Sequence, residues 1–336
     1  MRVALVQPAK LGSQSRGIGF YTDRLFRALN EEPAVNPSLV DFSFDPFAYN
    51  YFDLIHFPYF DPFFLTLPPI RSRKTVVTIH DLTPLVLESG FPRGIKGEMK
   101  WQIQKLIVKS VDQIVTDSKS SKTDIVRILG IPTNNVDVVY PAAGEEFKPL
   151  LDKTTLGKTR EKYGLKRQVF LYVGDINFNK NISGLLKAFA EFKRHNHESD
   201  LVLIGKSFLN MTLPESQAIN SEIVSLNLTN DVKILGFVSI EDLVGLYNLA
   251  AGYLQPSIYE GFGFPVVEAM ACGCPVICGK NSSLSEIAGS AVFYVDVTNP
   301  VEFADGMKEV FDLSNSGRIK LRDDLVNQAK KLSWKK

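Results

Sequence analysis

The sequence predicts an α/β protein with two doubly wound domains, each a parallel sheet covered by helices on both faces. Three observations support this fold class. The chain has 336 residues, too many for one ordinary hydrophobic core and suitable for two domains of about 150 residues each. Short apolar runs rich in Val and Ile alternate with helix-like segments along the chain. These runs are continuously apolar, as in strands that are covered on both faces.

The first half contains six such runs. We expect strands at Val3–Gln7, Leu39–Phe44, Asp53–Phe57, Thr75–His80, Gln113–Asp117 and Val136–Tyr140. A helix is predicted at 93–109, where five basic residues stand against a single acid and apolar residues are interleaved with them. Its apolar side would pack on the sheet and its basic side would face solvent. The alternative for this helix is docking on an anionic membrane.

The second half repeats the alternation. We expect strands at Val169–Val173, Leu201–Ile204, Val232–Leu235, Gly252–Gln255, Pro275–Cys278 and Ala291–Val295. A turn-rich, charged segment at 144–167 separates the halves, so the predicted domains are 1–150 and 151–336. Ligands of open parallel sheets bind beyond the carboxyl ends of the strands, and residues just after a strand therefore carry most weight.

Composition excludes several classes of protein. A formal net charge of +1 gives no reason to expect nucleic acid as a partner. No apolar run has the length of a secretion signal or of a membrane-spanning helix. The three cysteines, Cys272, Cys274 and Cys278, are odd in number and crowd into seven positions. We therefore expect reduced thiols, a cytoplasmic location and no metal site.

The most informative stretch is "IYEGFGFPVVEAMACGCPVI" at 258–277. It follows the strand expected at 252–255, and its Pro265 suits the first turn of a helix. Glu260 therefore belongs to a ligand-facing loop and Glu268 to the first turn of the helix. Taken alone, Glu260 is explained as a solvated carboxylate and Glu268 as an acid that complements the helix dipole.

The aromatic residues of this loop are harder to explain without a ligand. Phe262 and Phe264 should be buried or pressed against something. Gly263, between them, would let the backbone approach a bound molecule closely and turn amides toward it. The loop therefore indicates a binding site.

This stretch resembles the Glu-x7-Glu signature of glycosyltransferase family 4, retaining enzymes with the GT-B fold, which has two Rossmann-like domains facing a cleft. The resemblance covers Val3 to Trp334 and looks closest to mannosyltransferase-like members that extend bacterial surface polysaccharides. Its first domain would lie on the acceptor side and its second would bind the nucleotide sugar. Further matches in family order are Gly17-Ile-Gly19, "HDL" from His80, "TDSKSSKTDI" from Thr116, "VVYPAAGEEFKP" from Val138, "LYVGDINFNKN" from Leu171 and "ILGFVSIEDLVGLYNLA" from Ile234.

The resemblance also implies roles for individual residues. His80, Glu260 and Lys180 would be catalytic: the first two would lie beside the donor sugar, and Lys180 would stabilise the diphosphate as it leaves. Glu268 would accept hydrogen bonds from the ribose hydroxyls. The donor-binding set would comprise Gly17, Gly19, Gly174, Lys180, Phe262, Gly263, Phe264 and Glu268.

The implied activity is transfer of a hexose, of mannose or glucose type, from a GDP- or UDP-sugar to a hydroxyl of a glycan or lipid-linked acceptor. The reaction would retain the anomeric configuration and need no cofactor or metal. No assigned residue is an obvious covalent nucleophile, which favours same-face substitution. Such an enzyme would be cytoplasmic, with peripheral contact with the inner face of the membrane through 93–109 as a further expectation.

The sequence departs from the family pattern near the expected diphosphate site. Many relatives carry arginine directly after the glycine matched by Gly174 and directly before the lysine matched by Lys180. This chain has Asp175 and Asn179 at those positions. Diphosphate binding would then rely on Lys180, backbone amides and Lys206.

Two alternatives to an active transferase stay open. One is a sugar-nucleotide-binding protein of the same fold that has lost catalysis, and the other is a GT-B sugar epimerase. The first is made credible by the missing arginines. Relatives also usually continue well beyond the Ser-Trp pair matched by Trp334, whereas this sequence ends soon after it.

Overall fold

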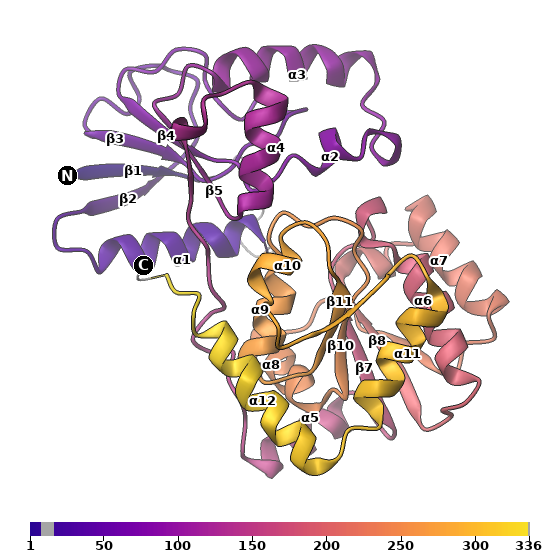
Figure 1. The fold of residues 1–336 in the computed structure, drawn as a ribbon. Helices are drawn as coiled ribbons and strands as arrows, with labels where there is room; N and C mark the ends of the chain where they lie inside the picture. Colours follow the sequence, from indigo (N-terminus) through magenta and orange to yellow (C-terminus); the bar gives the residue numbers. More distant parts are fainter. Residues whose placement is uncertain (8–16, 335–336) are drawn as a thin grey trace. The chain divides into compact units, whose positions relative to one another are not determined.

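The computed structural model describes residues 1–7 and 17–334. The chain forms two compact units, one of Met1–Pro141 with the chain end from Ser333, and one of Ala142–Leu332. Each unit is built on one six-stranded sheet in which every strand pair is parallel. Helices flank each sheet (Figure 1). The predicted fold class is confirmed.

The first sheet has the strand order β2-β1-β3-β4-β5-β6. Its strands are β1 (Arg2–Val6), β2 (Asn36–Val40), β3 (Leu54–Phe57), β4 (Lys74–Thr78), β5 (Gln113–Thr116) and β6 (Val136–Val138). Each overlaps one predicted run, but β2 ends at Val40, four residues before the predicted end at Phe44. The aromatic residues that extended the prediction pack on one another instead: the ring centres of Phe42 and Phe44 lie 4.8 Å apart.

Helices of the first unit connect these strands. They are α1 (Ile18–Asn30), α2 (Thr83–Val86), α3 (Gly94–Val108) and α4 (Lys119–Leu129), with short 3-10 turns η1 (Glu88–Gly90) and η2 (Thr133–Asn135). Right-handed crossovers that run in opposite directions from the sheet centre place helices on both of its faces. α1 accordingly lies on the face opposite α3 and α4 (Figure 1).

The second sheet has the order β12-β11-β10-β7-β8-β9. Its strands are β7 (Gln168–Val173), β8 (Ser199–Ile204), β9 (Val232–Ile234), β10 (Gly252–Gln255), β11 (Val276–Gly279) and β12 (Phe293–Val295). These overlap all six predicted runs of the second half. β7 and β10 are neighbours despite their distance in the sequence, with Phe170 paired to Gly252, so their carboxyl ends lie together.

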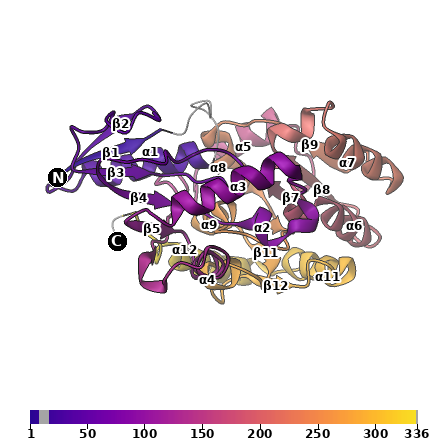
Figure 2. The ribbon, with the colours of Figure 1, turned by 90° about the horizontal axis from the view of Figure 1, so that it is seen from above.

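Helices cover both faces of this sheet as well. They are α5 (Lys153–Lys162), α6 (Ile182–Lys193), α7 (Pro214–Ser225), α8 (Ile240–Leu249), α9 (Phe264–Ala271), α10 (Leu284–Ile287), α11 (Pro300–Phe311) and α12 (Asn315–Ala329), with 3-10 turns η3 (Phe178–Lys180) and η4 (Lys206–Leu209). Phe170 of β7 packs in one core with Phe189 of α6 and Met307 of α11. On the opposite face, Tyr253 of β10 contacts Tyr247 of α8, with ring centres 5.7 Å apart. In the view from above, α6 and α11 lie on one side of this sheet and α8 on the other (Figure 2).

The units divide after Pro141, whereas the sequence placed the division after residue 150. Residues just beyond Pro141 are held by the second unit. The amide of Leu150 donates to Asn248 Oδ1 at 2.7 Å, and Asn248 Nδ2 donates to the carbonyl of Lys148 at 3.1 Å. Phe147 packs edge-on against Tyr247, at 6.1 Å between ring centres.

In the described ranges, no helix is both long and apolar enough to cross a membrane. The three cysteines are free and buried in the second unit. Burial raises the pKa of Cys278 to about 12 and raises those of Cys272 and Cys274 further. These thiols stay protonated and unreactive while the unit is folded.

Candidate active site

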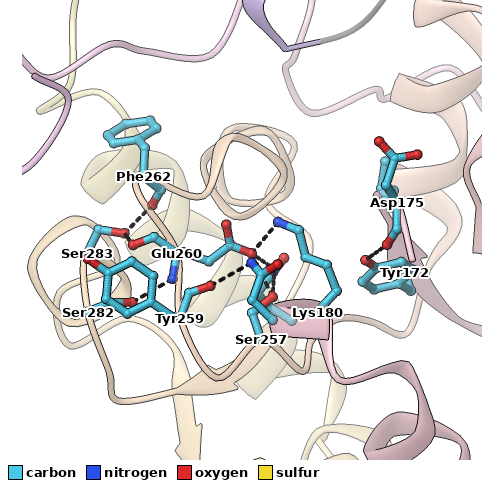
Figure 3. Close-up of polar contacts among 12 residues, drawn as sticks. Tyr172, Asp175, Lys180, Ser257, Tyr259, Glu260, Phe262, Ser282 and Ser283 are labelled. Atoms are coloured by element: carbon cyan, nitrogen blue, oxygen red, sulfur yellow. Dashed lines mark hydrogen bonds and ion pairs between the residues drawn. The ribbon is translucent and has the colours of Figure 1, made fainter. Parts of the chain in front are cut away.

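Two loops meet at the carboxyl ends of β7 and β10 in the second unit (Figure 3). The loop after β10 carries Glu260, and the turn η3 after β7 carries Lys180. Lys180 Nζ lies 2.6 Å from Glu260 Oε1, and the side chains are 21% and 9% exposed. The structure therefore joins two of the predicted catalytic residues in a largely buried ion pair.

Three donors converge on the same oxygen of Glu260. Besides Lys180, Gln255 Nε2 donates to Oε1 at 2.7 Å and Ser257 Oγ at 2.6 Å. Hydrogen bonds to an ionised acceptor are stronger than those between neutral groups, and these three fix the orientation of the carboxylate. Among the described residues, Oε2 receives no hydrogen bond. A solvated loop carboxylate is therefore a wrong interpretation of Glu260.

The backbone around Glu260 is held as firmly as its side chain. The amide of Glu260 donates to Ser282 Oγ at 2.9 Å. The hydroxyl of Ser283 contacts two carbonyls of the loop, that of Glu260 at 3.0 Å and that of Phe262 at 2.9 Å (Figure 3). Loop position thus depends on two serines from the segment after β11.

The positions that depart from the family pattern have structural partners here. Asn179 Nδ2 donates to the carbonyl of Tyr259 at 3.0 Å, and the Asn179 carbonyl accepts from the amide of Ile258 at 2.9 Å. This amide side chain therefore ties η3 to the loop of Glu260. Asp175, which follows Gly174 after β7, accepts from Ser207 Oγ at 2.7 Å and brings an acid to the same edge of the sheet.

Lys206 is a further cation at this edge. It opens η4, directly after β8, the strand that pairs with β7. Its ammonium nitrogen lies 5.0 Å from the centre of the Phe237 ring. A lysine in this position stacks on an aromatic face and keeps its charge exposed to solvent. The structure therefore offers two lysines at the carboxyl ends of adjacent strands.

Glu268 lies on α9, but in its second turn and not in the first as the sequence predicted. The helix begins at Phe264, because Gly263 adopts a left-handed conformation with φ of 102° and turns the chain one residue before Pro265. Glu268 is thereby removed from the exposed amides of the helix start, so dipole compensation does not explain it.

The surroundings of Glu268 are those of a fixed acceptor. Its side chain is 9% exposed, and Tyr247 Oη donates to its Oε2 at 3.0 Å. Burial, together with the charge of Glu268, raises the pKa of Tyr247 well above its usual value, so this phenol remains a donor. Phe262 is buried and packs edge-on against Phe264 at 5.0 Å. Packing within the loop accounts for its burial.

His80 in the first unit follows β4 and is held on both ring nitrogens. Nδ1 lies 2.5 Å from Asp117 Oδ2, and Nε2 lies 3.1 Å from the carbonyl oxygen of Pro58. A carbonyl and a carboxylate only accept hydrogen bonds, so both contacts are made together when the ring carries two protons. Burial lowers the pKa of His80, but the Asp117 carboxylate outweighs it, and the net pKa is raised.

A buried polar network adjoins this histidine. Tyr21 of α1 packs edge-on on the His80 ring at 4.6 Å, and its hydroxyl lies 3.3 Å from Thr78 Oγ1. His56 Nε2 lies 2.8 Å from the same oxygen. Burial, with the nearby charge of His80, lowers the pKa of His56 to about 4 and keeps that ring neutral.

Gly17 and Gly19 stand at the start of α1. Gly17 caps the helix with φ of 94° and ψ of −116°, a conformation that suits glycine alone. None of the described residues places an atom within 4 Å of a Cβ at this position. Gly19 lies inside the first turn of α1, whereas the sequence placed it in the preceding loop. Tyr21, one turn after Gly17, links this helix start to His80.

Sequence reasoning missed Asp117 and Tyr247 as site residues. Asp117 lies within the "TDSKSSKTDI" match and directly after β5, so its position at a strand end was the available signal. Nothing in the sequence placed Tyr247 near Glu268. Over the part of the chain that the structure describes, no cluster of three or more His, Cys, Asp or Glu side chains is placed to hold a metal ion.

Two doubly wound units, each on a six-stranded parallel sheet, form the architecture of the GT-B fold. Residues 157–332, more than half of the chain, match the family model of the glycosyl transferases group 1, and residues 16–144 match that of Glycosyltransferase Family 4. The chain therefore belongs to the glycosyltransferases of this family, as the motifs predicted.

Curated relatives agree with this assignment, and a solved structure shares the fold. The chain is 28% identical over 268 residues to O-antigen chain mannosyltransferase B of Escherichia coli, covering 79% of this chain and 68% of that protein. It is 28% identical over 271 residues to the serotype-specific mannosyltransferase WbdA of Escherichia coli, but these cover only 32% of WbdA. Anabaena Alr3699/HepE, solved in complex with UDP-glucose, has the same fold, with a TM-score of 0.80, 16% identity and coverage of 99% and 95% of the two chains.

Proposed function

We propose that this protein transfers a hexose from a nucleoside diphosphate sugar to a hydroxyl of a glycan or lipid-linked acceptor in surface polysaccharide synthesis, with retention of configuration. The observation that carries the proposal is the buried Lys180–Glu260 pair at the carboxyl ends of β7 and β10. The names of the relatives support mannose as the sugar. A GDP-sugar is then the first donor to test, and a UDP-sugar the second.

Residues of the second unit would bind the donor. Lys180 has three N–H donors and directs one to Glu260, so others can bind the diphosphate. Glu268, fixed by Tyr247, would accept from the ribose hydroxyls. Amides at Gly263 and Phe264 would bind hydroxyls of the sugar, near Oε2 of Glu260. Gly174 would allow the backbone after β7 to lie close to the phosphates.

The chemical step needs no covalent enzyme intermediate. The bond between the anomeric carbon and the phosphate oxygen breaks, and the nucleoside diphosphate leaves with the electron pair. The acceptor oxygen bonds to the same face of that carbon, and its proton passes to the departing phosphate. Lys180 stabilises the charge that grows on the leaving group, which is where a preorganised cation is most effective. No cofactor enters this scheme.

In the first unit, His80 and the start of α1 would contribute to the same reaction. A doubly protonated His80, held by Asp117 and the carbonyl of Pro58, is a fixed positive charge at the end of β4. The amides of Gly17 and Gly19 at the start of a helix of 13 residues suit an anionic ligand. We place the protein in the cytoplasm, in peripheral contact with the membrane through residues 93–109.

A binding protein without catalysis is the second candidate, because Asn179 and Asp175 stand where the family pattern has cations and both have structural partners. A two-stage assay separates the candidates. Thermal shifts with GDP-mannose, UDP-glucose, UDP-N-acetylglucosamine, GDP and UDP identify the donor. Release of nucleotide with and without a mannose-terminated acceptor then measures transfer.

An active transferase stabilised by one donor should release its nucleotide only when the acceptor is present. Glu268→Ala should mostly weaken donor binding, and Glu260→Ala should mostly lower turnover. Donor binding without release would favour the binding protein, and conversion of the donor sugar without acceptor would favour an epimerase. Wild-type rates for both variants would refute the site.

A further inference from the structure

The helix α3 presents apolar side chains to solvent as well as to the core. Only Trp101, Ile107 and Val108 among its large apolar residues are buried. Four others are exposed: Ile95 at 83%, Met99 at 62%, Ile103 at 45% and Leu106 at 72%. The sequence-based expectation that the apolar side packs on the sheet is therefore wrong for Ile103 and Leu106.

The four exposed residues form one stripe along the helix. Their spacings of four, four and three residues place them on a single face, because side chains three and four apart are neighbours on a helix. The buried residues Trp101, Gln104 and Val108 have spacings of three and four and occupy the opposite face. We call Ile95, Met99, Ile103 and Leu106 the outer stripe.

The buried face fixes the helix so that the outer stripe cannot turn inward. The Gln104 side chain is fully buried, and its Nε2 donates to the carbonyl of Phe64 at 2.6 Å and to Thr66 Oγ1 at 2.7 Å. Trp101 is 5% exposed and anchors the helix to the core. α3 lies at the outer surface of the first unit in both views of the ribbon (Figures 1 and 2).

Lysines flank the outer stripe on both sides. On a helical projection with about 100° per residue, Lys96 and Lys100 fall on one side of the stripe, and Lys105 and Lys109 on the other. Within the described residues, none of these four lysines forms an ion pair with a carboxylate. The one acid of the helix, Glu98, forms an ion pair with Arg93, with 2.6 Å between Glu98 Oε2 and Arg93 Nε.

An exposed phenylalanine extends the surface beyond the lysines. Phe64 is 62% exposed, and Lys100 Nζ lies 5.0 Å from the centre of its ring. The loop of Phe64 is the one that Gln104 holds against the helix. An apolar stripe with cations along both edges matches a lipid–water interface, where apolar side chains enter the acyl boundary and lysines extend to anionic headgroups.

We propose that the outer stripe of α3 inserts into the interface of an anionic bilayer, with Phe64 beside it and Lys96, Lys100, Lys105 and Lys109 on the lipid headgroups. Charge complementarity selects this occupant, because these four lysines, which have no carboxylate partner among the described residues, would repel the same surface on a second copy of the chain. The inference deepens the membrane contact of the proposed function by naming the side chains that make it, and it rests on that function in that a lipid-linked acceptor is held at a membrane. Binding itself needs neither donor nor catalysis.

The test is vesicle flotation of the full chain without substrates. Vesicles of phosphatidylcholine alone are compared with vesicles containing about 30% phosphatidylglycerol. The apolar variant is Ile95→Ser with Leu106→Ser, and the charge variant is Lys96→Glu with Lys100→Glu. Matched controls are Val224→Ser with Ile319→Ser, both exposed in the second unit, and Lys153→Glu with Lys158→Glu on α5.

Wild type should float with anionic vesicles and not with neutral ones. Each α3 variant should lower the bound-to-free ratio at least tenfold, while the matched controls change it less than twofold. High salt should weaken wild-type binding, because it screens the lysines. Transfer to a short water-soluble acceptor should be unchanged in the α3 variants, which separates failure of docking from failure of the proposed activity.

Two results would overturn the inference. One is equal flotation of wild type and both α3 variants. The other is a wild-type dimer in light scattering that Leu106→Ser converts to a monomer, together with no wild-type flotation, which would assign the stripe to self-association.

Discussion

Replacing Lys180 by methionine should destabilise the second unit by more than the loss of one hydrogen bond. Glu260, with a side chain 9% exposed, would keep its charge and lose the cation that lies against it. Removing one member of a buried pair costs roughly 3–5 kcal/mol. Because Ser257 and Gln255 still donate to Oε1, and Lys180 is 21% exposed, we expect the lower end, about 3 kcal/mol.

The companion variants give a thermodynamic cycle. Glu260→Gln leaves the ammonium of Lys180, which the solvent can reach, and should cost about 1.5 kcal/mol. The double variant has no uncompensated charge and should cost about 2.5 kcal/mol, less than the sum of the single variants. The pair should therefore show a coupling energy of about 2 kcal/mol.

The distribution of reporter residues allows each unit to be measured separately. Cys272, Cys274 and Cys278 are buried in the second unit, and both tryptophans, Trp101 and Trp334, belong to the first. The rate of thiol labelling under native conditions thus reports opening of the second unit, and tryptophan fluorescence in urea reports the first. A cost of 3 kcal/mol corresponds to labelling roughly 150-fold faster.

Tryptophan fluorescence should be unchanged in all three variants and serves as the internal control. Labelling of Lys180→Met at the wild-type rate would refute the argument that the pair is buried and mutually dependent. Costs that add in the double variant would refute the coupling, even if each single variant is unstable.

Three further outcomes follow from the site. The first unit should be most stable near pH 6.5, measured by tryptophan fluorescence in urea. Below that pH His56 binds a proton in the unfolded state but not in the folded state, where its pKa is about 4. The free energy of unfolding therefore falls by up to about 3 kcal/mol. Above pH 6.5, the stability that protonated His80 contributes is lost as the pH rises through its raised folded pKa. Asp117→Asn should remove this loss of stability at alkaline pH. If the loss persisted in that variant, the His80–Asp117 pair would not be its cause. Tyr247→Phe should weaken donor binding by about five- to tenfold in calorimetry, because it removes one hydrogen bond that positions Glu268. Unchanged affinity in this variant, beside weakened affinity in Glu268→Ala, would contradict that role. Gly17→Ala should cost the first unit about 1–3 kcal/mol in urea from backbone strain, because its φ of 94° is unfavourable for a residue with a Cβ and no described residue contacts that Cβ. An unchanged midpoint would contradict the strain argument.

The strands were predictable because a short, continuously apolar run bounded by turns is typical of a strand covered on both faces. The predicted bounds of β2 were too far along the chain, because Phe42 and Phe44 pack on each other beyond the end of the strand. Glu268 fell in the wrong turn because proline at the start of a helix does not distinguish its first from its second position. Helix periodicity likewise gives two apolar faces on α3 without indicating which one the core takes.

The candidate site residues followed as a set from the family resemblance, but their pairings did not. Contact between Lys180 and Glu260 depends on β7 and β10 being neighbours, and strand order is a property of the whole sheet. Asp117 reaches His80 for the same reason, since β4 and β5 pair in register. A sequence reports which residues end strands, whereas the sheet decides which strand ends meet.

The triple contact on Glu260 Oε1 bears on how a nucleotide would depart after transfer. Lys180 is shared between an acid of the protein and, in our proposal, a phosphate of the product. When the phosphate begins to dissociate, the Glu260 carboxylate competes with it for the ammonium of Lys180. Ser257 and Gln255 hold the carboxylate in the position from which it competes. A lysine that is paired with a carboxylate of the protein binds the product phosphate less tightly than an unpaired lysine would. We therefore expect Glu260→Gln to lengthen the residence time of the spent nucleotide.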